Sequence, residues 1–287
     1  MKKEKDDKEI KFIDAQSTEK MIEKLHGEIS KAIKNIKVLN PQITKAVDLI
    51  AKTMLNGGKL YVYGCTSPAR HAIVENLELQ SLFSLNPELI QTSILGGDRA
   101  LKDIKSEPKD SENTGRAEIV LSFVKDTDVL IILNSNENQN YTKGALTVAE
   151  QKNIPTVLIS QNGQTSEYAD INIALPYKSK KIATIQETYI STVYKTVLNM
   201  IFTGVMIKIG KVYENNIVDP NVERNKKQAV NIVMKYAKVD EDTAIQTLDK
   251  CKYHAKAAIV MLNKNVDLKT AITQLKKQKN KINDFVK

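Results

Sequence analysis

The sequence predicts an α/β fold, in which a parallel sheet of five strands is covered by helices on both faces and a small helical domain follows. Three observations predict it. Short, unbroken apolar runs alternate with helical patterns along residues 1–218, and such runs are typical of strands buried on both faces. Polar turns follow these runs, and from residue 219 the composition changes to short amphipathic helices. We therefore predict two domains, residues 1–218 and residues 219–287.

Hydrophobic periodicity defines the elements of the first domain. Apolar residues recur at helical spacing after Ser17 and again after Asn40-Pro41, which predicts two helices before the first strand. A loop is expected over residues 103–115, and a long buried helix over Ala183–Met206. The apolar runs predict strands over Leu60–Tyr63, Leu89–Leu95, Asp128–Asn134, Pro155–Ser160 and Ile171–Leu175.

The second domain is expected to contain four short helices joined by polar segments. A compact helical unit of this kind usually serves packing or partner contact rather than chemistry. The predicted helices are Val222–Tyr236, Glu241–Asp249, Ala255–Leu262 and Leu268–Leu275.

Composition argues against several classes of protein. No run of 18 or more apolar residues occurs, and the charged start, Met1–Ile10, lacks the apolar centre of a signal peptide, so we expect a cytoplasmic protein without a membrane span. Cys65 and Cys251 lie far apart, and the three histidines fall in separate segments. We therefore expect no disulfide, no metal site and no cofactor.

The net charge of +9 raises the question of nucleic-acid binding. Only four basic residues are arginines, and the lysines are scattered among acids with few aromatic residues nearby, so we expect no specific nucleic-acid partner. The densest lysine cluster lies between Lys276 and Lys281. It could complement the dipole of a terminal helix or contact phosphate.

The stretch from Lys59 to Arg70 predicts a strand, a polar turn and a helix. Gly64 ends the apolar run, Ser67 is suited to cap a helix, and Pro68 is suited to a first helical turn. Such a turn presents free N–H groups at the positive end of a helix dipole, so it predicts a site for an anion such as a sugar phosphate. Ligands of parallel sheets bind beyond the carboxyl ends of the strands, which adds the turn at residues 134–140.

Two carboxylates follow on the same predicted helix. Glu75 and Glu78 are three residues apart and share a helix face. Carboxylates close to an anion site suggest acid and base chemistry, whereas the alternative interpretation is a solvated helix face.

At this point the chain resembles the N-acetylmuramic acid 6-phosphate etherases, a family of sugar isomerase (SIS) domain proteins. The resembling stretches occur in family order along nearly the whole chain. They include Asn56-Gly-Gly-Lys-Leu-Tyr-Val, Leu95-Gly-Gly-Asp-Arg-Ala-Leu, Gly144-Ala-Leu and Ala257-Ala-Ile-Val-Met-Leu. The resemblance implies a homodimer of three-layer, flavodoxin-like SIS domains, each followed by a domain similar to ubiquitin-associated domains. It also implies a metal-independent enzyme that cleaves the D-lactyl ether of a 6-phosphorylated amino sugar by elimination and addition of water.

The resemblance places the family's site residues on particular positions. The family's first turn, of the form GxGTSGR, corresponds to Tyr63–Arg70 here, which implies that Thr66, Ser67 and Arg70 bind substrate while three glycines are replaced. Glu78 falls on the acid that assists the leaving lactate. The position of the family's base falls on Lys109, and the resemblance leaves Glu107 or Asp110 to replace it if the loop is shifted.

The second turn departs further from the family pattern. Small residues of the form SxSGxT are replaced here by Asn134-Ser-Asn-Glu-Asn-Gln139, with Glu137 at the position of a glycine. A carboxylate there repels a phosphate dianion. The neutral side chains of Asn136, Asn138 and Gln139 would suit an uncharged sugar, and the alternative is a solvated loop.

Three hypotheses follow. The first is an etherase-type carbon–oxygen lyase that acts on a phosphorylated amino sugar. The second is a non-catalytic SIS protein that binds a sugar derivative as a sensor or regulator. The third is a structural, partner-binding protein whose sugar pocket is vestigial.

Overall fold

The computed structural model describes residues 13–106, 108–135, 139–161, 163–175, 183–221 and 225–286. These residues form two compact units. The first holds the chain up to Ala46, Leu60–Val74 and Thr92–Ile201, and the second holds Val47–Lys59, Glu75–Gln91 and the chain from Phe202 onward.

A five-stranded sheet carries the fold, with strand order β2-β1-β3-β4-β5. The pairs β1–β3, β3–β4 and β4–β5 are parallel, in the register Gly64↔Leu133, Leu133↔Ile159 and Ile159↔Ile173. The strands are β1 Leu60–Gly64, β2 Ile90–Ile94, β3 Val129–Asn134, β4 Thr156–Ser160 and β5 Ile171–Ala174. The predicted α/β fold class with a parallel five-stranded sheet is confirmed.

The central strands are buried on both faces, which explains their unbroken apolar sequences. On one face Tyr61, Tyr63, Leu130 and Ile132 pack with residues of two helices, α6 Glu112–Leu121 and α7 Gln139–Gln151. The alternate residues Val62 and Ile131, which point to the opposite face, are also fully buried. Such strands need helices on both faces, as predicted.

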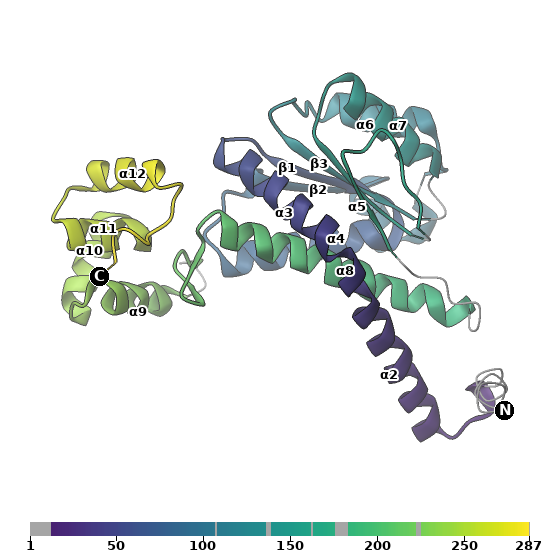
Figure 1. Ribbon diagram of the computed structural model, residues 1–287, viewed down its shortest axis with the longest axis horizontal. Coiled ribbons are helices and arrows are strands. Elements are labelled where there is room, and N and C mark those ends of the chain that lie inside the picture. Colours follow the sequence, from purple (N-terminus) through teal and green to yellow (C-terminus); the bar gives the residue numbers. More distant parts are fainter. Residues whose placement is uncertain are drawn as a thin grey trace. The chain divides into compact units, whose positions relative to one another are not determined.

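Helices connect and cover the strands (Figure 1). The helices of this part of the chain are α2 Thr18–Asn35, α3 Asn40–Leu55, α4 Thr66–Leu82, α5 Gly97–Lys102, α6 Glu112–Leu121, α7 Gln139–Gln151 and α8 Ala183–Lys208. Short 3₁₀ turns occur at η1 Ile13–Ala15, η2 Ile36–Leu39, η3 Pro87–Leu89 and η4 Ile104–Ser106.

Two local predictions are wrong. The expected loop over residues 103–115 is shorter, because α6 begins at Glu112 and packs on α7, a tertiary contact that no local signal announced. Helix α4 begins at Thr66, so Ser67 lies in its first turn and its hydroxyl contacts Ser191 instead of capping the helix.

Helices α6 and α7 lie side by side (Figure 1). A Cβ atom added to Gly115 would lie 2.0 Å from the carbonyl oxygen of Tyr141, and one added to Gly144 would lie 2.0 Å from that of Glu112. The two glycines therefore let the two backbones touch.

The C-terminal residues form four helices with a hydrophobic core of their own, which begins at Val218 and ends at Phe285. The elements are the hairpin β6 Val212–Tyr213 and β7 Asn216–Ile217, followed by α9 Lys226–Ala237, α10 Glu241–Lys250, α11 Ala255–Lys264 and α12 Leu268–Lys277. The N-termini of the four helices are capped by the side chains of Asn225, Asp240, His254 and Asp267. The domain boundary at residue 218 remains a proposal that this core supports.

One segment of α8, Tyr189–Lys208, is long and apolar enough to cross a membrane by length and composition. Half of it is buried inside the protein, including Tyr194, Leu198 and Phe202. Its apolar character is therefore accounted for by packing in the core.

Candidate functional site

The first turn lies where β1 ends against β3. Gly64 pairs with Leu133, and a Cβ atom at position 64 would lie only 2.7 Å from the Cβ atom of Leu133, so glycine is required there. Thr66, two residues after Gly64, has a backbone φ of +54°. A β-branched residue in this left-handed region carries strain, and such strain is concentrated at functional sites.

The polar side chains of this turn contact neighbouring elements. The hydroxyl oxygens of Ser67 and of Ser191 on α8 lie 2.8 Å apart. The Arg70 guanidinium donates to the carbonyl oxygen of Ala100 on α5 at 2.7 Å. Thr66, Ser67 and Arg70 are half-buried and lie in the first turns of α4, directly after β1. That these three residues bind substrate stays a prediction.

The second turn begins at the end of β3, the neighbour of β1. Asn134 is buried, and its side chain accepts from the Thr142 hydroxyl at 3.0 Å and donates to Gln164 at 2.8 Å. Its backbone carbonyl accepts from the hydroxyl of Tyr194. Asn134 thus holds β3, α7 and α8 together, a structural role that its place in a polar run did not indicate.

Asp110 binds the start of α7. Its two carboxylate oxygens accept from the backbone N–H groups of Asn140, at 3.0 Å, and Tyr141, at 2.7 Å. These are two of the unpaired donors that a helix N-terminus would offer to an anion. The carboxylate therefore acts as a helix cap supplied from a distant loop, a contact that the sequence did not suggest.

The remaining predicted site residues have different surroundings. Gln139, the first residue of α7, is exposed, whereas Glu107, Asn136 and Asn138 lie outside the described residues. On α4, Glu78 is exposed and Glu75 is 4% exposed. The interpretation of both carboxylates as a solvated face is therefore wrong for Glu75.

A polar network lies on the α6 and α7 side of the sheet. The carboxylate of Glu118 on α6 accepts from the hydroxyl of the fully buried Tyr141 and from that of Ser93, the latter at 2.8 Å. Burial and the nearby Glu118 charge raise the pKa of Tyr141 well above its usual range, and burial raises the pKa of Tyr63 to about 12. Both tyrosines therefore stay protonated at neutral pH, and Tyr141 donates its hydroxyl proton to Glu118.

Among the described residues, no group of three or more His, Cys, Asp and Glu side chains is placed to hold a metal ion. The described residues at this edge of the sheet offer hydroxyls, amides, the Arg70 guanidinium and the carboxylates named above.

Comparison with known proteins identifies the family. A family model described as SIS domain matches residues 16–160. An N-acetylmuramic acid 6-phosphate etherase from Klebsiella aerogenes is 32% identical, over 87% of this chain and 85% of the relative. An etherase from Bacillus subtilis (strain 168) is 30% identical, over 89% of this chain and 85% of the relative. The chain belongs to the N-acetylmuramic acid 6-phosphate etherase family of SIS domain proteins.

A solved structure agrees on the architecture of this etherase-family chain. A candidate phosphosugar isomerase involved in capsule formation, from Bacteroides fragilis NCTC 9343, superposes with a TM-score of 0.52 at 14% identity. The match covers 74% of this chain and 97% of that chain. At this level of identity the likeness concerns the fold.

Proposed function

We propose that this etherase-family chain binds a phosphorylated amino-sugar derivative at the carboxyl edge of its sheet and cleaves the D-lactyl ether of that sugar. The observation that carries the proposal is similarity to etherases over 85% of their length, at about 30% identity. The polar turn of Thr66, Ser67 and Arg70 at the end of β1 supports it, because ligands of parallel sheets bind at such turns.

In the proposed reaction, a carboxylate removes a proton from the sugar while a carboxylic acid protonates the ether oxygen. The carbon–oxygen bond breaks, D-lactate leaves, and water then adds to the resulting double bond. Glu78 is the proposed acid, and a residue of the loop before α6, Glu107 or Asp110, is the proposed base. A general acid contributes most when its pKa lies near the working pH, which closure over a bound sugar would favour for the exposed Glu78.

The second candidate function is binding without turnover, as a sugar sensor or regulator. The capping role of Asp110 favours it, because both oxygens of this carboxylate already bind α7. A base must reach the proton that it removes, and these two hydrogen bonds hold the Asp110 carboxylate at the helix.

The test is release of D-lactate from N-acetylmuramic acid 6-phosphate by the purified protein, with binding of the same sugar measured by calorimetry. Lactate from the wild type and none from Glu78→Ala would support the lyase. Binding without lactate would support the sensor. Absence of both from a folded protein would contradict both proposals and favour a structural role.

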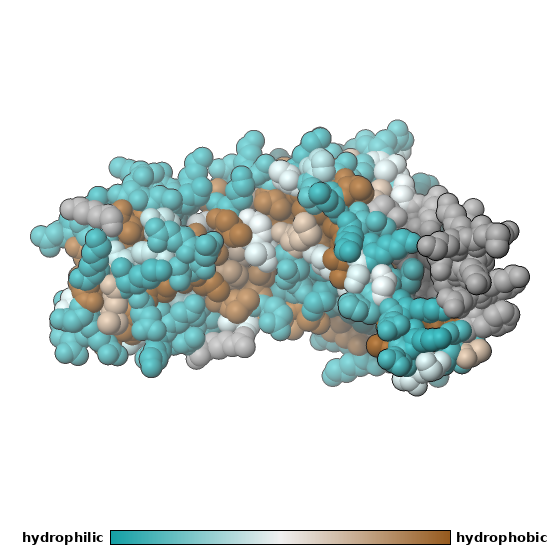
Figure 2. All heavy atoms as spheres, turned by 60° about the horizontal axis from the view of Figure 1, so that its bottom comes forward, coloured by the Kyte–Doolittle hydropathy of each residue, from teal (hydrophilic) through white to brown (hydrophobic). Residues whose placement is uncertain are grey.

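We also propose that the chain forms a homodimer and acts in the cytoplasm. Helix α2 supports the dimer, because Ala32 is its one fully buried residue while Ile22 and Ile33 are 55% and 41% exposed. Most of the stability of a helix in a protein comes from packing of its apolar face. Figure 2 shows a mostly hydrophilic surface with hydrophobic residues gathered in patches, and such patches are typical of contact surfaces.

A further inference from the structure

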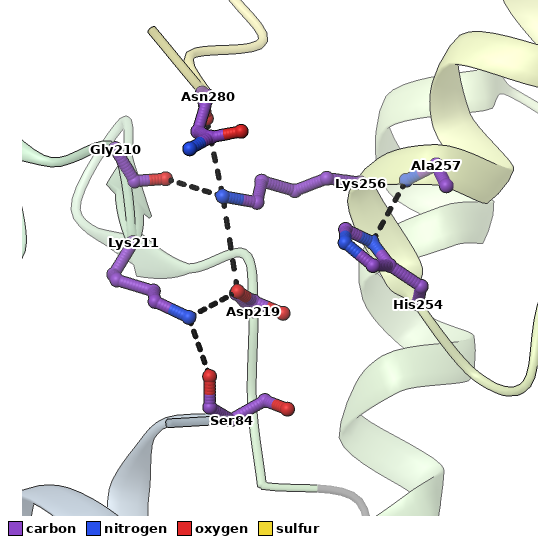
Figure 3. Close-up of polar contacts among 8 residues, drawn as sticks. All are labelled: Ser84, Gly210, Lys211, Asp219, His254, Lys256, Ala257 and Asn280. Atoms are coloured by element: carbon purple, nitrogen blue, oxygen red, sulfur yellow. Dashed lines mark hydrogen bonds and ion pairs between the residues drawn. The ribbon is translucent and has the colours of Figure 1, made fainter. Parts of the chain in front are cut away.

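The ammonium group of Lys256, on α11, is buried where three chain segments meet. This lysine is 3% exposed. Its Nζ atom lies 3.1 Å from the carbonyl oxygen of Asn280, 3.3 Å from that of Gly210 and 3.7 Å from Oδ2 of Asp219 (Figure 3). Lysine is seldom fully buried unless it is paired, so this arrangement calls for an explanation.

A second lysine shares the same carboxylate oxygen. Nζ of Lys211 lies 2.5 Å from Oδ2 of Asp219 and also contacts the carbonyl oxygen of Ser84 (Figure 3). The side chains of Lys211 and Asp219 are 13% and 11% exposed. Among the described residues, two cations thus face one anion, which leaves an excess positive charge in a poorly solvated place, and burial of an unbalanced charge is costly.

The cluster joins the C-terminal helices to the segments that lead into them. Gly210 follows α8, Asp219 follows β7 and Asn280 follows α12. Contact is close, since a Cβ atom at Gly210 would lie 2.6 Å from the carbonyl oxygen of Asn280. On the other side, the Ser84 N–H donates to the carbonyl oxygen of Asp219 at 2.9 Å. Lys256 therefore holds the ends of the helical unit to its connecting segment.

We propose that Lys256, Asp219 and Lys211 form a proton-operated latch that holds helices α9 to α12 more firmly once Lys256 becomes neutral. A neutral amine can still donate to the two carbonyl oxygens, while Asp219 keeps Lys211 as its partner. Loss of one proton therefore removes the excess charge and keeps the hydrogen bonds. This inference does not depend on the proposed enzymatic function.

The direction of the pH effect follows from the folded and unfolded states. Burial lowers the pKa of Lys256 from 10.5 to about 8, Asp219 opposes the shift, and Lys211 adds to it. Since the folded unit releases this proton before the unfolded chain does, its stability rises as the pH increases from about 8 toward 10.5. Below pH 8 both states are protonated and this contribution is constant.

Other titratable groups lie near the latch. His254 caps the N-terminus of α11, and its Nδ1 accepts from the Ala257 N–H (Figure 3). Lys281 follows Asn280 and is exposed. Burial raises the pKa of the Cys251 thiol from its ordinary value of 9.0. The thiol of the unfolded chain therefore ionises first, and this lowers the stability of the fold as the pH rises above about 9. The measurement therefore belongs between about pH 7 and pH 9.

Hydrogen exchange of the full-length protein tests the latch. We expect amides of α11 and α12, corrected for intrinsic exchange rates, to gain protection by up to about tenfold per pH unit above pH 8, since one pKa unit corresponds to a factor of ten. In Lys256→Met this gain should vanish. In Lys264→Met, which changes an exposed lysine of the same helix, the gain should persist.

A second variant keeps the test decisive if Lys256→Met does not fold. Lys211→Met removes the repelling cation, so the rise in protection should move to higher pH. A flat wild-type profile, an unchanged profile in Lys256→Met, or an unshifted profile in Lys211→Met would each overturn the proposal.

Discussion

At the scale of single residues, polar side chains near the edge of the sheet form hydrogen bonds with one another and with the backbone. Asn134 begins a turn predicted to bind a ligand, and Asp110 lies in the loop predicted to supply a base, yet each satisfies buried or helix-terminal backbone and side-chain groups. A buried polar group left without a partner costs about 1–3 kcal/mol, so these roles constrain what the same residues can do for a ligand.

Substitution of Asp110 separates the role of a cap from that of a base. We expect Asp110→Ala to lower the free energy of unfolding by about 1 kcal/mol, the usual cost of a lost N-cap, measured by urea denaturation. Asp110→Asn keeps one acceptor oxygen and should therefore lower the free energy of unfolding by less. If Asp110→Asn instead keeps its stability and abolishes release of lactate, Asp110 is the base.

At the scale of elements, the pair α6 and α7 depends on two glycines. Gly115 and Gly144 each face a backbone carbonyl of the partner helix at a distance that leaves no space for a methyl group. The pair in turn carries Glu118 and Tyr141, whose hydrogen bond lies on the inner side of both helices.

The glycine contact predicts a large effect of a small substitution. We expect Gly144→Ala to destabilise the fold by about 3 kcal/mol or more, at the upper end of the usual cost of overpacking, because two helix backbones must separate. Thermal and urea unfolding measure this loss of stability.

The matched control for this substitution is Gly27→Ala, on α2. No atom lies within 4 Å of the added methyl group there, and the backbone is helical. It should stabilise the helix by about 0.5–1 kcal/mol. Equal effects of the two substitutions would contradict the close packing of α6 on α7.

At the scale of the whole molecule, the apolar face of α2 predicts self-association. We expect the double substitution Ile22→Asp and Ile33→Asp to shift a dimer toward monomer in light scattering after size-exclusion chromatography, because two charges would then lie in an apolar contact. Lys31→Asp, on the same helix, changes charge at an exposed position and should leave the mass unchanged. A monomeric wild type would contradict the proposed dimer.

The sequence by itself determined the fold class, the strands and the helices other than α5 and α6, because burial of a parallel sheet demands unbroken apolar runs that are visible without any tertiary contact. Family membership was also readable, since motifs such as Leu95-Gly-Gly and Gly144-Ala-Leu keep their order along the chain.

Only the tertiary structure decided the roles of polar residues. Asp110 and Asn140, Asn134 and Gln164, and Lys256 and Asp219 lie about 30 or more residues apart, and their partners are chosen by the packing of elements. A polar side chain looks the same in sequence whether it binds a ligand or a neighbouring backbone. Which of these it binds depends on the donors and acceptors that the fold brings within hydrogen-bond distance.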